Sequence, residues 1–150
     1  MSECGLRHSY PPTFALYKTR SEVRFRLSFQ PKHMTFNDLG LTEALLKAVS
    51  DKGYEIPSPI QEKAIPRVLE GKDVLASAQT GTGKTAGFAI PMIQLLCKES
   101  PRNKRVIRAL VLTPTRELAA QVLEDIVTYS KYTDLRSMVI FGGVKQNPQV

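Results

Sequence analysis

The chain of 150 residues has only two cysteines and no long apolar run, and each shortage excludes a class of protein. Cys4 and Cys97 lie far apart and outside any C-x-x-C pair, which argues against a disulfide framework and against a zinc site. No apolar stretch reaches the roughly 18 residues of a membrane span, and no apolar signal core opens the chain. We therefore expect a soluble, cytoplasmic protein with no membrane partner.

Acidic residues are also scarce, because 21 lysines and arginines stand against 14 aspartates and glutamates, a net charge of +7. Residues 1–33 carry six basic and two acidic side chains, which is +4, and residues 34–150 carry fifteen and twelve, which is +3. An excess of positive charge favours an anionic partner such as nucleic acid, although it says nothing about the fold.

Residues 1–33 show no helical period and contain a Pro11-Pro12 pair. Within them, residues 23–30 alternate apolar with basic or polar side chains, as a half-buried strand would, but no partner strand is recognisable nearby. We expect a basic tail that is disordered or not native. A targeting peptide, a docked arm and an upstream translation artefact, with Met34 as the original start, remain alternatives.

From residue 35 onward, helix signals alternate with short apolar runs. Ser58 stands directly before Pro59 and three residues before Gln61, a capping-box arrangement that starts a helix, and Gly71 is placed to close it. Similar signals predict three further helices: one between Thr42 and Gly53, one over residues 84–97, and one after Pro114 that continues through Ile126.

Three apolar runs of strand length lie among these helices, at residues 74–77, 107–113 and 136–141. Strands separated by helices of this length predict right-handed crossovers and a parallel sheet with helices on both faces. The expected fold class is therefore α/β.

The most specific signal is the loop between the first predicted strand and a helix start, which reads Ala78-Gln79-Thr80-Gly81-Thr82-Gly83-Lys84-Thr85. Its two glycines allow backbone N–H groups to surround oxyanions, Lys84 supplies positive charge, and the helix N-terminus adds a partial positive charge. The Thr85 hydroxyl is suited to bind magnesium. Ala78 departs from the general phosphate-loop pattern, which has glycine there. The alternative is a glycine-rich turn that binds nothing.

Two further motifs accompany this loop. Residues 53–61 read GYEIPSPIQ, with Phe36 17 residues before Gly53, and residues 114–119 read PTRELA. In this order and spacing, residues 35–149 resemble the front half of the first RecA-like domain of a DEAD-box RNA helicase, and the Gly142-Gly143 pair resembles the family's later glycine doublet. The residues most similar to the RhlE-type branch are Phe88, Pro91, Gly143-Val144 and Asn147-Pro148-Gln149. The resemblance implies a truncated RecA-like P-loop NTPase domain that uses ATP and Mg.

The base of the nucleotide is expected beside the residues that precede the loop. The Gln61 amide can pair with both the N6 amino group and N7 of adenine, a pattern that guanine does not offer. Alternatively Gln61 only completes the Ser58 capping box, and the two roles can coexist. The resemblance places Phe36 and Tyr54 near the base, although a solitary phenylalanine such as Phe36 also suits a core.

The resemblance further implies RNA contacts through the sugar-phosphate backbone, which carry no sequence information, at Pro114, Thr115, Arg116, Gly142 and Gly143. A helix start and a guanidinium group are both suited to a phosphate. The alternatives are an ordinary ion pair between Arg116 and Glu117 and a plain loop turn at the glycines.

In the family, an Asp-Glu-Ala-Asp motif, a Ser-Ala-Thr motif and a second RecA-like domain come later, and none occurs before Val150. The one adjacent acidic pair, Glu124-Asp125, lies in a predicted helix and is expected on a solvated face. Phosphoryl transfer needs more than a phosphate loop, so we expect a partial helicase domain of marginal stability with no appreciable ATPase activity alone. Its alternatives are a non-catalytic nucleotide- or RNA-binding fragment and an unrelated P-loop kinase or ATPase.

Overall fold

A computed structural model describes residues 34–98 and 106–143. The expectations for the basic tail and for the RhlE-like residues after 143 lie outside the described residues. Within the described ranges, no helix is both long enough and apolar enough to cross a membrane.

All four predicted helices are confirmed, with one short helix before them. The order is η1 (Phe36–Leu39), α1 (Glu43–Asp51), α2 (Pro59–Leu69), α3 (Lys84–Lys98) and α4 (Arg116–Tyr129). Thr42, Ser58 and Thr115 occupy the N-cap positions of α1, α2 and α4, as the sequence predicts. Of these three side chains, that of Thr115 accepts a hydrogen bond from a helix N–H group, that of Leu118. Proline inside α2 and α3 does not end either helix.

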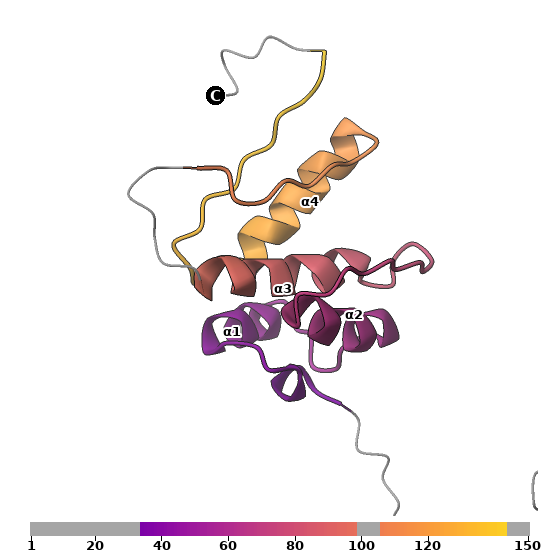
Figure 1. Cartoon of the computed structure of the whole chain (residues 1–150), viewed down its shortest axis with the longest axis vertical. Coiled ribbons are helices and arrows are strands. Elements are labelled where there is room, and N and C mark those ends of the chain that lie inside the picture. Colours follow the sequence, from indigo (N-terminus) through magenta and orange to yellow (C-terminus); the bar gives the residue numbers. More distant parts are fainter. Residues whose placement is uncertain (1–33, 99–105, 144–150) are drawn as a thin grey trace, which may run out of the picture. The chain divides into compact units, whose positions relative to one another are not determined.

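The core forms around α3, which packs against α2 and α4, while α1 contacts α4 and η1 contacts α2 (Figure 1). Every helix contributes buried side chains to this core, and Leu41 adds one from the turn between η1 and α1. The members are Phe36, Leu39, Leu41, Leu45, Val49, Ile65, Ala86, Ala89, Ile90, Ile93 and Tyr129. Ile65 and Ile90 are fully buried. Apolar burial on both sides of α3 fixes the start of that helix, where the phosphate loop lies.

The predicted parallel sheet is not confirmed. Residues 74–77, 107–113 and 136–141 have no assigned secondary structure, no β-strand is assigned anywhere in the described residues, and Figure 1 draws these segments without arrows. A strand is defined by hydrogen bonds to a neighbouring strand, and an apolar run supplies only one side of such a ladder. The helices of the α/β prediction are therefore confirmed, and its parallel sheet stays a prediction.

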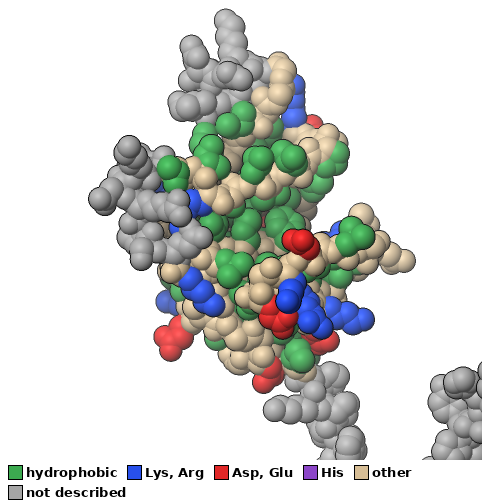
Figure 2. Space-filling view, in the orientation of Figure 1, with side chains coloured by type: hydrophobic (Ala, Val, Ile, Leu, Met, Phe, Trp, Pro, Cys, Tyr) green, Lys and Arg blue, Asp and Glu red, His purple; other side chains and the backbone are tan. Residues whose placement is uncertain are grey.

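Apolar side chains of these unassigned segments are exposed. Ile107 is 88% exposed, Leu112 is 84% exposed, and Leu75 and Leu110 are also open to solvent. Figure 2 shows hydrophobic side chains gathered over one face of the molecule. Contiguous exposed apolar surface beside unpaired extended backbone is a hazard for aggregation.

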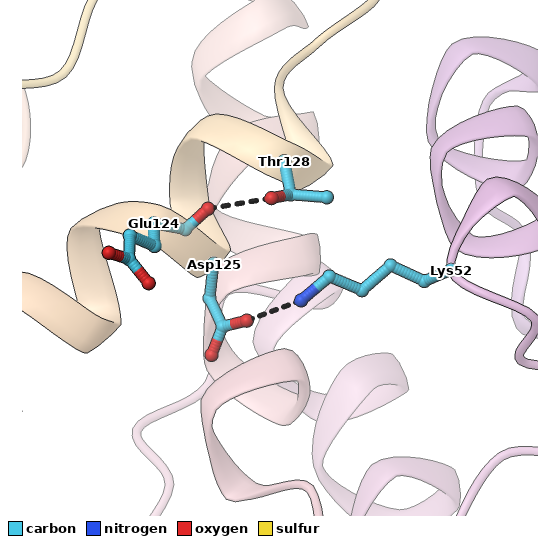
Figure 3. A network of polar contacts seen from close by, with 4 residues as sticks. All are labelled: Lys52, Glu124, Asp125 and Thr128. Carbon is cyan, nitrogen blue, oxygen red and sulfur yellow. Dashed lines mark hydrogen bonds and ion pairs between the residues drawn. The ribbon is translucent and has the colours of Figure 1, made fainter.

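One acidic pair differs from its predicted environment. Asp125 on α4 lies 2.5 Å from Nζ of Lys52, both side chains are mostly buried, and Figure 3 shows the two pointing toward each other. The main-chain carbonyl of neighbouring Glu124 accepts a hydrogen bond from Thr128 at 2.7 Å. The expectation of a solvated face is therefore wrong for Asp125, because α4 packs against α1 and brings this carboxylate to Lys52.

A second polar contact joins the same two parts of the chain. Asp51, the last residue of α1, accepts hydrogen bonds from Oη of Tyr132 at 2.6 Å and from Nζ of Lys131 at 3.1 Å. The Tyr132 hydroxyl and then the Lys131 ammonium lower the pKa of Asp51 below its ordinary value. In return, Asp51 raises the pKa of Lys131.

Candidate nucleotide-binding site

The loop over residues 78–85, which leads into α3, has the backbone conformation that the sequence predicts. Gly81 has φ +80° and Gly83 has φ +82°, both in the left-handed region that favours glycine. Thr82 donates from its hydroxyl to the carbonyl of Gln79 at 2.8 Å, which closes the loop on itself. The loop therefore ends directly at the N-terminus of α3, where the helix dipole favours negative charge.

Lys84 folds back over this loop. Its Nζ donates to the carbonyl of Gln79 at 2.6 Å and also to the carbonyl of Ala78. These carbonyls hold the ammonium group beside the loop without neutralising its charge. A phosphate oxygen in the same place would be a stronger partner, because hydrogen bonds between two charged groups exceed those to neutral carbonyls.

Gln61, in the first turn of α2, connects that helix to the phosphate loop. Its side chain is 5% exposed. Oε1 accepts from the main-chain N–H of Ser58 at 2.9 Å, and Nε2 donates to the carbonyl of Gly83 at 3.1 Å. The capping contact and a contact to the loop thus coexist. One N–H and one lone pair of the amide remain for another partner.

Ser58 lies beside this contact. Its hydroxyl is buried and has no hydrogen-bond partner within residues 34–98 and 106–143. It lies 3.4 Å from the position that a Cβ on Gly83 would occupy. Leaving a buried hydroxyl unpaired costs free energy, because the group has lost its hydrogen bonds to water. The Ser58 hydroxyl is therefore available as a hydrogen-bond donor and acceptor next to the loop.

The two aromatic residues predicted near the base have opposite environments. Phe36 on η1 is 4% exposed and belongs to the core, whereas Tyr54, just after α1, is exposed. The buried Phe36 ring fits the core alternative, and its stacking on a base stays a prediction. Tyr54 has a face open to a ligand.

The structure brings together the residues predicted to contact RNA. Nη2 of Arg116 donates to the carbonyl of Gly142 at 2.5 Å, and Pro114, Thr115 and Arg116 are all exposed. The Thr115 hydroxyl caps α4 by accepting from the N–H of Leu118 at 3.2 Å. Arg116 keeps further N–H donors for a phosphate, because a guanidinium group has five.

Comparison with known proteins gives the family. The sequence model of the DEAD/DEAH box helicase family matches residues 58–150, which is more than half of the chain. This chain is a DEAD/DEAH box helicase family member. It is 51% identical over 125 residues to the DEAD-box ATP-dependent RNA helicase RhpA of Helicobacter pylori, covering 77% of this chain and 24% of that protein.

Further relatives agree with this family. The chain is 50% identical over 118 residues to the ATP-dependent RNA helicase DeaD of Haemophilus influenzae, covering 78% of this chain and 19% of that protein. This DEAD/DEAH box helicase chain therefore spans a quarter or less of the length of these relatives. Their names do not single out the RhlE type, which stays a prediction.

Solved structures of DEAD-box proteins have the same fold in this region. A DEAD box protein from Methanococcus jannaschii has a TM-score of 0.69 and 43% identity, over 77% of this chain and 31% of that one. The RNA helicase Prp28 from Chaetomium thermophilum, bound to ADP, has a TM-score of 0.70 and 34% identity, over 79% and 30%. The described residues thus correspond to part of a RecA-like domain of the DEAD-box type.

One buried polar residue of this helicase chain escaped the sequence reasoning. Gln94 on α3 is 2% exposed, and its amide is hydrogen-bonded to the main chain of Gly40 and Thr42. The sequence did contain a signal. Residue 94 lies four positions after Ile90 and directly after Ile93, which places it on the apolar face of the helix. A polar side chain on such a face needs internal partners.

Proposed function

We propose that this chain is the ATP-binding part of an ATP-dependent RNA helicase. The observation that carries the proposal is the contact between Gln61 and Gly83, because it joins the residue suited to read adenine to the loop suited to hold phosphates. The N–H and lone pair that Gln61 keeps free are the two groups that the N7 and N6 positions of adenine require. The ADP in the Prp28 structure supports a nucleotide at such a site.

Within this proposal the phosphates lie over residues 78–85, beside Lys84 and the start of α3. Left-handed glycines and an ammonium group already facing the loop fit a polyphosphate. Thr85 is the second residue of α3, and its hydroxyl is the one magnesium ligand that the loop would supply. Magnesium would neutralise phosphate charge there, with its other ligands coming from phosphates and water.

The nucleotide part of the proposal is tested with Lys84→Ala. Loss of a charge-assisted contact to phosphate, about 1.5–3 kcal/mol, should raise the Kd for ATP roughly 10- to 100-fold by isothermal titration calorimetry. Lys98→Ala is the matched control, because Lys98 is an exposed lysine at the opposite end of the same helix. Equal ATP affinity in Lys84→Ala and Lys98→Ala would remove the phosphate site from the proposal.

The RNA part of the proposal rests on the Arg116–Gly142 contact, which joins two segments suited to a phosphate backbone. Arg116→Ala should weaken the binding of all single-stranded RNA sequences alike and reduce the slope of log affinity against log salt by about 0.7. Arg67→Ala, which removes an exposed arginine from α2, is the control. A loss that depends on RNA sequence would argue against a backbone contact.

We also infer that residues 74–77, 107–113 and 136–141 are strands of a parallel sheet of the RecA-like type once partner strands are present. Their apolar composition and the exposure of their apolar side chains, which a sheet covered by helices would bury, support this. The competing function is a nucleotide- or RNA-binding segment without turnover. A phosphate-release assay with RNA separates the two, because only the helicase hypothesis in a complete protein predicts steady ATP hydrolysis. The cytoplasmic location and the absence of a membrane partner stay predictions from sequence.

A further inference from the structure

Gln94 connects the phosphate-loop helix to a segment more than fifty positions earlier in the chain. Its Oε1 accepts from the N–H of Thr42 at 2.9 Å, and its Nε2 donates to the carbonyl of Gly40 at 2.9 Å. Both partners belong to the turn between η1 and α1, and Gly40 has the left-handed φ of +70° that this turn requires. A single buried amide therefore holds the turn against α3.

The contact repeats the arrangement at the phosphate loop. Gln61 accepts from the N–H of Ser58, the N-cap of α2, and donates to the carbonyl of a left-handed glycine, Gly83. Gln94 accepts from the N–H of the N-cap of α1 and likewise donates to the carbonyl of a left-handed glycine. Both of these glutamines are buried.

The two contacts are joined through η1. This short helix packs against α2, and its buried Phe36 and Leu39 belong to the same core cluster as Ile65 of α2 and Ile90 of α3. The turn held by Gln94 directly follows η1. Displacing that turn would move η1, and with it a helix that packs against α2, which carries Gln61 in its first turn.

We propose that Gln94 is a positioning residue for the base side of the nucleotide site. By fixing the turn after η1 on α3, it sets where α2 carries Gln61 relative to the phosphate loop. The inference rests on the proposed ATP-binding function and assigns no ligand contact to Gln94 itself. It separates the base half of the site from the phosphate half, because the phosphate half, residues 78–85, leads directly into α3 and does not include the turn.

The test compares ATP with inorganic tripolyphosphate, which has no base, as ligands of the 150-residue chain in calorimetric titrations. Gln94→Leu should weaken ATP binding about tenfold, because the base contact shifts, and should change tripolyphosphate binding less than about twofold. The control is Val122→Ala, which removes buried apolar volume from α4 without touching the turn. The inference would be overturned if Gln94→Leu weakened the binding of ATP and of tripolyphosphate equally. It would also be overturned if Val122→Ala, at the same thermal stability as Gln94→Leu, lost as much ATP affinity.

A second measurement covers the case in which Gln94→Leu does not fold. Gln94→Glu keeps the acceptor for the Thr42 N–H and loses the donor to Gly40. Coupling between sites is reciprocal, so ATP should slow hydrogen exchange at the Thr42 amide in the wild type, and Gln94→Glu should reduce that effect. An exchange rate at Thr42 that ATP leaves unchanged would overturn the inference.

Failure of the proposed function gives a different result. If the wild type binds neither ATP nor tripolyphosphate, the nucleotide site and this inference fall together. If the wild type binds ATP, Lys84→Ala weakens that binding, and Gln94→Leu binds ATP as tightly as the wild type, only the positioning role of Gln94 is overturned.

Discussion

Nε2 of Gln61 lies 3.1 Å from the carbonyl oxygen of Gly83 and 2.3 Å from the position that a Cβ on Gly83 would occupy. The absence of a side chain at residue 83 is thus what allows α2 to approach the phosphate loop. Gly81 shares the left-handed conformation, but no atom lies within 4 Å of its Cβ position. The two glycines of the loop are needed for different reasons.

Alanine substitution at these glycines should separate backbone strain from crowding. Both variants pay about 1–2 kcal/mol for a left-handed alanine, and Gly83→Ala also displaces the Gln61 amide, which adds about 1 kcal/mol. Urea unfolding should therefore show a larger loss for Gly83→Ala than for Gly81→Ala. Equal losses in the two variants would mean that Gln61 moves aside freely.

The exposed apolar segment at residues 107–113 should limit solubility of the isolated chain. Replacing Leu110 and Leu112 together by lysine should reduce self-association in sedimentation velocity experiments, because charge on an unpaired extended segment opposes edge pairing. Stability against urea should change by less than about 0.5 kcal/mol per site, as at other exposed positions.

A buried residue provides the contrast for this experiment. Ile90→Ala, at a fully buried position of α3, should cost about 2–5 kcal/mol. If the Leu110/Leu112 double variant lost as much stability as Ile90→Ala, the segment would be packed in solution.

The contact of Asp51 with Tyr132 predicts a loss of stability in acid. The pKa of Asp51 is lowered in the folded chain, so its contribution is fully present above the unfolded pKa of about 3.9 and is lost as the pH falls through the folded value. Asp51→Asn should therefore lose less stability than the wild type between about pH 4 and pH 2. Urea midpoints measured across this range would test the difference.

Tyr132→Phe is the conservative companion to this variant. It removes the hydrogen bond that contributes most to the lowered pKa of Asp51 and leaves the Lys131 contact in place. Its acid profile should lie between those of the wild type and Asp51→Asn. Parallel profiles of stability against pH for all three proteins would show that the pKa of Asp51 is the same in the folded and unfolded chain.

The predicted helices and the phosphate loop agree with the structure, whereas the predicted strands are not confirmed by it. A helix is specified by signals a few residues apart, such as Ser58 with Gln61 or the glycine after α1, and the loop glycines adopt the predicted left-handed conformation. A strand has no such local specification. Residues 107–113 have the right composition, but their pairing depends on a neighbour that an apolar pattern does not identify.

The sequence by itself determined the helix limits, the phosphate loop and the family, because caps, periodicity and motif spacing are written along the chain. Only the tertiary structure decided which polar atoms meet: Gln61 with Gly83, Arg116 with Gly142, Lys52 with Asp125, and Gln94 with the turn at Gly40. These partners lie 22 to 73 positions apart. Their meeting depends on how the helices pack around α3, which no local signal in the chain records.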